Sequence, residues 1–396
     1  MGSIHWIHIS DLHYNKVGTQ TDSMREKLPS YISDIAKKQK IDYIFFTGDM
    51  RFAPNKTFLD QTADYFSSLC SAAGITNEGL FAVIGNHDVN RKDPQRLRAI
   101  KKLEKCYVEK DSVIDATLID KLKVGRQEYY ALLQKILTNE QYLLHSNTST
   151  LHFSITTKDL NIVHVDSTIM YTESKQSDFF VGSYALKTAL KNCDRTKPTI
   201  LLSHYSLDCF DPTEQKAILL LLKDYNVQLW LAGHKHTDII HKDRDYFYVA
   251  HSGNQTYEKL TSPGFVEGFL DTESGEGYFR VHKWNDSSDW AIYQTLTDKT
   301  DRRDMTNNLD RTKYPFILDD WLRANGRKAI KASSSVNQVS EFIHNFKGQS
   351  FFLDKITADL KLDGATILPI LENLQNQGVI KPINFDKTHW QILQKN

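Results

Sequence analysis

The stretch from Ala82 to Val89, which reads A-V-I-G-N-H-D-V, constrains this chain more than any other segment. The apolar run from Leu80 to Ile84 has the length and branching of a buried strand, and Gly85 lets the chain turn sharply where the run ends. An amide, an imidazole and a carboxylate follow, at Asn86, His87 and Asp88. A strand that ends in such a cluster is expected to place it at the carboxyl edge of a sheet, where open α/β folds hold their sites.

The same design, a strand-like run followed by metal-binding side chains, recurs four more times. By itself, G-N-H-D also suits a turn that an aspartate caps, but five such clusters in succession are hard to explain by packing. The further candidates are Asp11 and His13, Asp49, His204, and His234 with His236. Imidazole and carboxylate together suit manganese, iron, zinc or nickel rather than calcium. With Asn86 the set has seven ligands, too many for one ion, so we expect two ions that share a bridging carboxylate.

Helical and strand-like segments alternate in the first part of the chain. Strands are predicted at 5–10, 42–47 and 80–84, with helices at 25–40 and 56–73 between them. This β-α-β-α-β order predicts parallel strands with right-handed crossovers, and therefore an α/β fold. Later strands are predicted at 151–155, 161–167, 199–203 and 227–232, with helices at 182–191 and 213–225. The runs 246–250, 264–270 and 277–284 follow without helices, which suggests a second, more antiparallel sheet.

Composition limits the class of protein. With 396 residues, of which 40% are hydrophobic, the chain can form one large core and a smaller domain. Lys and Arg number 49, and so do Asp and Glu, so the net charge gives no argument for a polyanionic partner. The four cysteines are scattered, as in cytosolic proteins with reduced thiols. Because no secretory signal is visible and no apolar run is long enough to span a bilayer, we expect a cytoplasmic protein without a membrane contact.

The region 91–146 interrupts the alternation with polar, helical sequence. Between Arg91 and Lys110 there are eight basic residues and three acidic ones. Such a charge run is either the solvated face of a helix or a basic surface that binds a phosphate backbone. Both interpretations stay open at this point.

The pattern changes again near the C-terminus. Residues 298–334 are polar and weakly periodic, with a helix suggested at 315–324, and are predicted to be a linker. Residues 335–396 have the order helix, helix, turn, helix, strand pair, which is typical of a winged-helix-like domain. The predicted third helix, 365–377, has no Lys or Arg, whereas helices that read DNA usually carry basic or amide side chains. This composition favours contact with a protein partner over contact with DNA.

Taken together, the five blocks resemble the signature of the calcineurin-like metallophosphoesterases. They read D-L-H at 11–13, G-D at 48–49, G-N-H-D at 85–88, S-H-Y at 203–205 and G-H-K-H at 233–236. The resemblance covers residues 4 to 285 and leaves out the winged-helix-like domain. It implies a four-layer α-β-β-α sandwich, here over residues 1–297, with a helical insertion at about 91–146.

The resemblance also implies a role for each matching residue. One metal ion would take Asp11, His13, Asp49 and His236, and the second would take Asp49, Asn86, His204 and His234. His87 would protonate the leaving oxygen or stabilise the transition state, and Asp88 would orient His87. The two ions, manganese before iron, zinc or nickel, would hold a hydroxide for in-line attack on phosphorus.

The intact G-N-H-D block looks more like the phosphodiesterase and nuclease branches of the family than like the phosphoprotein phosphatases. We therefore expect hydrolysis of phosphodiester bonds in nucleic acid or nucleotides. A cyclic-nucleotide phosphodiesterase, a phosphatase, and a nuclease subunit recruited to a larger complex through residues 335–396 are the alternatives. A scaffold without catalytic activity is disfavoured because no ligand position of the signature is lost.

Three residues have roles that the resemblance leaves open. Arg51 either contacts a substrate phosphate or pairs with an acid. Tyr205 follows the lone histidine, where many members of the family have His or Pro, so the substrate preference of other members cannot be transferred to this chain. His251 is either part of the pocket or a loop histidine whose hydrogen bonds are satisfied.

Overall fold

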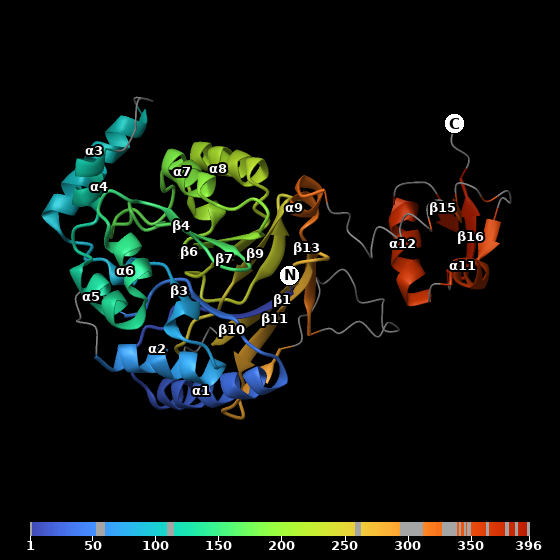
Figure 1. The fold of residues 1–396 in the computed structure, drawn as a ribbon, viewed down its shortest axis with the longest axis horizontal. Coiled ribbons are helices and arrows are strands. Elements are labelled where there is room, and N and C mark those ends of the chain that lie inside the picture. The colour runs from blue at the N-terminus through green and yellow to red at the C-terminus, as the bar shows by residue number, and fades with distance from the viewer. Residues whose placement is uncertain are drawn as a thin grey trace. The chain divides into compact units, whose positions relative to one another are not determined.

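The computed structural model describes residues 2–52, 60–108, 115–257, 263–293 and 312–326, the segments 350–361, 364–376, 380–384 and 387–393, and residues 339, 342, 343 and 346. The chain divides into two compact units. The first contains Met1–Thr297 and Asp310–Trp321, and the second contains Asp298–Leu309 and Leu322–Asn396. Figure 1 shows the elements of both. Within the described residues, no helix has the length and hydropathy needed to cross a membrane.

The first sheet of the larger unit is built around three parallel strands. These are β1 (Ser3–Ile9), β2 (Tyr43–Phe46) and β3 (Leu80–Ala82). β10 (Gly264–Asp271) pairs antiparallel with β1, and β11 (Glu276–Trp284) pairs with β10. β12 (Trp290–Ile292) and β13 (Tyr314–Ile317) both pair with β11. Every residue of β2 and β3 is buried, which explains why these strands read as continuous apolar runs.

The second sheet has the strand order β4-β5-β6-β7-β9-β8. Its strands are β4 (Phe153–Thr156), β5 (Asn161–His164), β6 (Thr199–Ser203), β7 (Leu229–Ala232), β8 (Ile240–Asp243) and β9 (Phe247–His251). The four strands β5, β6, β7 and β9 run parallel, while β4 and β8 are antiparallel at the two edges. The carboxyl ends of the central parallel strands therefore lie along one edge of this sheet.

Helices cover the outer face of each sheet (Figure 1). α1 (Thr19–Lys38) and α2 (Asp60–Ala73) pack on the first sheet, and α7 (Ser183–Lys191) and α8 (Pro212–Asp224) pack on the second. α1 buries Met24, Leu28 and Ile32, which lie on one face at helical spacing. α8 begins where the Asp211 side chain accepts the amide of Thr213. The predicted α-β-β-α sandwich is confirmed.

The insertion between β3 and β4 is helical, as predicted. It contains α3 (Pro94–Val108), α4 (Ala116–Leu122), α5 (Gln127–Ile136) and α6 (Asn139–Ser146). Two buried arginines join it to the segment after β5. Arg96 donates to the carbonyl oxygens of Thr168, Ile169 and Tyr171 at 2.8–3.1 Å, and Arg126 forms an ion pair with Asp166. The insertion is therefore held firmly against the second sheet.

The smaller unit has its own core. β14 (Ser350–Phe352), β15 (Ile380–Pro382) and β16 (His389–Ile392) form an antiparallel sheet in the order β14-β16-β15, beside α11 (Leu353–Leu360) and α12 (Gly364–Asn376). Its buried residues are Val339, Ile343, Phe351, Ile356, Ile367, Leu371, Ile380 and Trp390. The two later helices and the strand pair lie where the sequence predicts them, and most of the helix predicted from 336 to 346 falls outside the described residues. The winged-helix-like assignment stays a prediction.

Three sequence predictions need correction. The runs 246–250, 264–270 and 277–284 do not form a sheet of their own, because β9 joins the parallel strands of the second sheet while β10 and β11 extend the first. Strand-like sequence shows which face is buried but not which edge a strand joins. The predicted linker 298–334 contains the strand β13, which was not predicted, and the helix α9 (Asp319–Ala324), which lies within the helix suggested at 315–324. α1 begins at Thr19, six residues before the predicted start at Arg25.

Candidate metal centre

Five of the seven predicted ligands have left-handed backbone. The φ angles are 51° for Asp11, 47° for His13, 59° for Asp49, 69° for His234 and 54° for His236. Non-glycine residues adopt this conformation rarely, although Asp and His do so more readily than most, and such strain concentrates at functional sites. The chain therefore bends sharply just after β1, β2 and β7, where the polar residues begin.

Hydrogen bonds tie these bent segments together across the two sheets. The amide of Asp11 donates to the carbonyl of Gly48, and the amide of His13 donates to that of Asp49, both at 3.0 Å. The amide of His234, after β7 of the second sheet, donates to Asp11 Oδ2 at 3.0 Å. The strand ends of both sheets thus form one connected polar site.

One group of ligand atoms consists of Asp11, His13 and His236. The Nε2 atoms of the two histidines lie 3.3 Å apart, and Asp11 Oδ1 lies 3.2 Å from His236 Nε2 and 3.9 Å from His13 Nε2. The other nitrogen of His13 faces the carbonyl oxygen of Arg51 at 3.2 Å, which fixes the ring. Three ligand atoms within 4.8 Å of one another can hold one cation.

A second group contains Asp49, Asn86 and His204. His204 Nε2 lies 2.8 Å from Asn86 Oδ1 and 3.5 Å from Asp49 Oδ2, while its Nδ1 faces the carbonyl of Thr47 at 2.8 Å. The ring of His234 lies beside that of His204, with 5.3 Å between their centroids. The structure therefore brings all seven predicted ligands into one site.

Asp49 lies between the two groups. Its carboxylate is within 4.8 Å of ligand atoms of Asp11 and His204, and also of His13 and His87. A carboxylate has two oxygens and can serve two ions, whereas one ring nitrogen cannot. The imidazole nitrogens and carboxylate oxygens form two neighbouring groups of possible ligand atoms. This combination of ligand types fits two divalent transition-metal ions.

The electrostatics of the site also fit cations. Burial raises the pKa of Asp49 well above its usual value, and the nearby charges of Asp11 and Asp88 raise it further. Burial lowers the pKa of His13 to about 4 and that of His234 to about 3, so both imidazoles are neutral. Neutral imidazole is the form that binds metal ions, and bound cations would offset the buried negative charge.

Asp88 holds the backbone of the site. Its carboxylate accepts four backbone N–H groups within the described residues, from Asp49, Met50, Arg51 and Gly85, at 2.9–3.3 Å. Gly85 is required in this turn, because a Cβ atom there would lie 2.0 Å from the amide nitrogen of Asp49. Asp88 thus fixes the backbone around Asp49 and Gly85, while its role in orienting His87 stays a prediction.

His87 lies beside the two groups of ligands on the short 3₁₀ helix η2 (Asn86–Asp88). Its side chain is 24% exposed, compared with 29% for His236 and at most 1% for His13 and His204, and its Nε2 lies 3.9 Å from Asp49 Oδ2. The ring stacks on Phe52, with centroids 5.7 Å apart. His87 therefore combines proximity to the metal ligands with access from outside.

Arg51 pairs with an acid, which resolves one of the alternatives left by the sequence. Its Nη1 forms an ion pair with Glu128 of α5, while Nε and Nη2 donate to the carbonyls of His87 and Asp88 at 3.0 and 3.2 Å. The residue is 3% exposed. Arg51 thus connects the helical insertion to the loop that carries His87.

Other residues near the site were either uncertain or absent from the sequence prediction. Tyr205 is fully buried, with its ring 4.3 Å from that of His234. His251 is buried at the end of β9, and its Nδ1 lies 3.3 Å from the carbonyl of Gly233. Ser167 was not predicted, although its hydroxyl accepts the amides of His204 and Tyr205 at 3.2 and 3.0 Å. A serine after a strand carries no signal that would identify this role.

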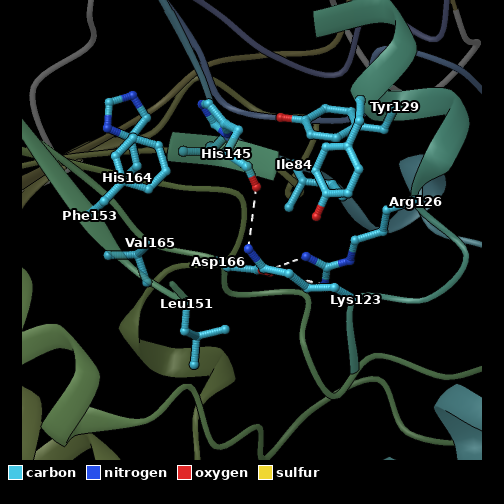
Figure 2. Close-up of a pocket in the computed structure, with 12 residues that line it drawn as sticks. Ile84, Lys123, Arg126, Tyr129, His145, Leu151, Phe153, His164, Val165 and Asp166 are labelled. Carbon is cyan, nitrogen blue, oxygen red and sulfur yellow. Dashed lines mark hydrogen bonds and ion pairs between the residues drawn. The ribbon is translucent and has the colours of Figure 1, made fainter. Parts of the chain in front are cut away.

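A separate cavity lies between β3, the insertion and β5 (Figure 2). It is lined by the ion pair of Arg126 and Asp166 and by Lys123, which donates to the carbonyl of His145 at 3.3 Å. About 20 Å³ is open to a water-sized molecule, enough for a single water. None of the seven predicted ligands lines this cavity, so we assign it a structural role.

Comparison with known proteins identifies the family. The family model described as calcineurin-like phosphoesterase matches residues 4–238, more than half of the chain. The chain therefore belongs to the calcineurin-like phosphoesterase family. The match covers all five sequence blocks that carry the predicted ligands.

Individual relatives are distant. The uncharacterized metallophosphoesterase-like protein YydB of Bacillus subtilis (strain 168) is 20% identical over 294 residues, which cover 71% of this chain and 60% of that protein. A dimetal phosphatase from Danio rerio is 11% identical, with 70% of this chain and 95% of that chain covered and a TM-score of 0.39. The 5′-nucleotidase of Candida albicans SC5314 is also 11% identical, with 72% and 52% covered and a TM-score of 0.39.

Proposed function

We propose that this protein hydrolyses phosphodiester bonds, with nucleic acid as the substrate, by means of two divalent metal ions. The observation that carries the proposal is the position of Asp49 between two groups of ligand atoms. One ion would be held by Asp11, His13, Asp49 and His236, and the other by Asp49, Asn86, His204 and His234. Manganese suits this mixture of imidazole, carboxylate and amide, with iron, zinc and nickel as alternatives.

Bound ions of this kind would activate a water molecule and offset the negative charge that develops on phosphorus. The chain's own residues supply the remaining functions. His87 lies next to Asp49 and is partly exposed, so its imidazole is placed to donate a proton or a hydrogen bond to the leaving oxygen. Asn86 is a neutral ligand, which limits the negative charge that an incoming phosphate must approach.

A basic cavity in the insertion supports a polymeric substrate. Arg98 and Lys102 of α3 and Lys121 of α4 line it, together with Gln95, Ala99, Thr117 and Leu118, and its volume is about 370 Å³. Of the other basic residues in this stretch, Arg96 is occupied by backbone carbonyls and Lys92 lies 3.6 Å from Glu173. Three cations around one cavity suit the regularly spaced phosphates of a nucleic acid better than a single small diester.

The second unit favours recruitment by a protein. α12, the helix that would correspond to a recognition helix, contains no Lys or Arg between Gly364 and Asn376. We propose that residues 335–396 contact a protein partner, so that the phosphoesterase domain acts as the nuclease subunit of a complex. Removal of residues 335–396 should then abolish partner binding and leave hydrolysis of a small diester intact.

The test compares small and polymeric substrates in the same preparation. Bis(p-nitrophenyl) phosphate, p-nitrophenyl phosphate and labelled single- and double-stranded DNA and RNA are incubated with the Mn²⁺-loaded protein. The proposal predicts diester and polymer cleavage, both lost in His87→Ala. The double variant Arg98→Glu with Lys102→Glu should lose polymer cleavage and retain hydrolysis of the small diester.

Two other results would contradict this proposal in different ways. Hydrolysis of small diesters without polymer cleavage would indicate a cyclic-nucleotide or dinucleotide phosphodiesterase. Hydrolysis of the monoester alone would indicate a phosphatase.

A further inference from the structure

Arg91 is only partly buried, but one of its terminal guanidinium nitrogens sets it apart from the buried arginines of the larger unit. It lies between η2 and α3, three residues after Asp88, and its Nε and Nη2 atoms are buried without a hydrogen-bond partner among the described residues. Arg25, Arg51, Arg96 and Arg126, by contrast, donate through their guanidinium groups to carbonyl or carboxylate oxygens. Arg25, Arg96 and Arg126 also have an Nε without a partner, but among the described arginines a buried terminal nitrogen without one occurs at Arg91, where Nη2 is left to pair with water or with a bound group.

Tyr171 positions this guanidinium. The Cζ atom of Arg91 lies 4.9 Å from the centroid of the Tyr171 ring, a stacking arrangement that stabilises an arginine without using its N–H donors. The Tyr171 ring lies 6.1 Å from the ring of Tyr205, which in turn lies 4.3 Å from the ring of His234. Tyr171 thus connects Arg91 to the cluster of proposed metal ligands through packed aromatic rings.

Arg91 also lies close to the centre of the site along the chain. It follows η2 (Asn86–Asp88), which carries the proposed ligand Asn86 and the partly exposed His87, and it precedes α3. This position in the chain and the packing of Tyr171 together place Arg91 beside the proposed metal ligands, where a substrate phosphate would approach.

We propose that Arg91, stacked on Tyr171, binds a non-bridging oxygen of the substrate phosphate, and this inference rests on the proposed function. A guanidinium presents N–H groups in a fixed fork that matches two phosphate oxygens. Its N–H groups remain available because Tyr171 holds it by the face of the guanidinium plane. Arg91 would hold the phosphate between the metal ions and His87 and so orient the scissile bond.

The chain offers a matched control at a distant position. Arg195 also stacks on a tyrosine, with its Cζ atom 4.5 Å from the Tyr225 ring, but it is exposed and precedes β6, at the opposite end of that strand from His204. Arg195→Ala removes the same charge and the same kind of stacking contact. It is expected to leave phosphate binding unchanged.

The experiment titrates inorganic phosphate into the full-length, Mn²⁺-loaded protein by calorimetry and measures diester hydrolysis in parallel. Arg91→Ala is expected to weaken phosphate binding at least tenfold and to raise the KM for bis(p-nitrophenyl) phosphate by a similar factor, with a smaller change in kcat. Arg91→Gln, which keeps part of the aliphatic stem and a neutral polar end, should show the same loss and guards against a packing defect in the alanine variant. Manganese content should equal that of the wild type in both variants.

The outcomes separate this inference from the proposed function. Equal phosphate affinity and equal KM in wild type, Arg91→Ala and Arg91→Gln would overturn the role of Arg91, even if the diester is hydrolysed. Phosphate binding that depends on Arg91 in a protein that hydrolyses no diester would support the role of Arg91 and contradict the proposed function. A loss of phosphate binding in Arg195→Ala equal to that in Arg91→Ala would overturn the inference, because the effect would then be one of overall charge.

Discussion

The carboxylate of Asp88 accepts the backbone amide of Asp49 at 3.0 Å, so one acidic residue fixes the backbone from which another projects. Three more backbone amides, from Met50, Arg51 and Gly85, donate to the same carboxylate. The bridging position proposed for Asp49 therefore depends on a residue that need not touch a metal ion itself.

Replacement of Asp88 by asparagine should weaken both the fold and the metal site. An asparagine side chain has one acceptor oxygen, and its NH₂ group would face amide donors. We expect Asp88→Asn to lower the free energy of unfolding by about 2–4 kcal/mol and Mn²⁺ affinity by about 10- to 100-fold. Urea unfolding and Mn²⁺ titration measure the two effects.

Asp211→Asn is the matched control for this substitution. Asp211 caps α8 by accepting the amide of Thr213 at 2.8 Å, a role that asparagine fulfils about as well. The free energy of unfolding of the Asp211→Asn variant should differ from that of the wild type by less than about 0.5 kcal/mol. Equal effects of the two substitutions would show that Asp88 is an ordinary cap.

Gly85 should tolerate no side chain. A Cβ atom at this position would lie 2.0 Å from the amide nitrogen and 2.1 Å from Oδ1 of Asp49. Gly85→Ala is therefore expected to displace Asp49 and to abolish diester hydrolysis. Gly74→Ala is the control, because nothing lies within 4 Å of its Cβ position although its φ is 70°. It should cost about 1 kcal/mol of stability and leave hydrolysis unchanged, and inactivity of both variants would contradict this explanation.

Arg51 and Glu128 form one ion pair but should differ in importance. Arg51 is buried and also donates to the carbonyls of His87 and Asp88, whereas the Glu128 side chain is 50% exposed. A lysine cannot reproduce the fork that contacts both carbonyls, so Arg51→Lys should lower kcat at least tenfold. Glu128→Gln should change stability by less than about 1 kcal/mol and leave kcat near that of the wild type. A larger effect of Glu128→Gln than of Arg51→Lys would refute this ranking.

The surroundings of Glu267 should make the stability of the fold depend on pH. It is buried between β1 and β11, where it bonds to His5 and His282 at 2.8 Å and to Arg280 at 2.9 Å. Burial alone would raise the pKa of Glu267, but the hydrogen bonds with His282 and His5 and the charge of Arg280 hold it well below its usual value. A depressed pKa in the folded state adds stability above the unfolded value of 4.5, and this stability is lost as the pH falls below that value.

Glu267→Gln should therefore be less stable than the wild type at pH 7, by about 3–5 kcal/mol, because it leaves the charge of Arg280 without its counter-ion and removes the carboxylate that His5 and His282 contact. The difference should shrink as the pH is lowered from 5 to 3. Urea midpoints measured across this range provide the test. A difference that stays constant with pH would show that Glu267 contributes only through packing.

The sequence identified the ligands because each of them ends a strand. Asp11, Asp49 and His204 each follow a buried run, and parallel strands bring such ends to one edge. The partner strand of each run was harder to predict. β9 and β10 have similar apolar sequences, but one joins β7 and the other joins β1, and local periodicity contains no information about that choice.

Residues that support the site were missed because their partners are remote in sequence. Glu128 is 77 positions from Arg51 and lies on a helix whose polar sequence predicts only an exposed surface. Tyr171 lies in an irregular segment between β5 and α7, where no periodic pattern applies. The left-handed backbone at Asp11 and His234 accompanies a tertiary hydrogen bond between these two residues, which are remote in sequence, so local preference gives no signal for it.

The central claim is that Asp49 bridges two metal ions. The most direct measurement is the manganese content of the purified, Mn²⁺-loaded protein together with its electron paramagnetic resonance spectrum, for the wild type and for Asp49→Ala. We predict two Mn²⁺ ions per chain with the spectrum of a spin-coupled pair in the wild type, and loss of the coupling in Asp49→Ala. A single uncoupled Mn²⁺ in the wild type, or coupling that survives in Asp49→Ala, would contradict the claim.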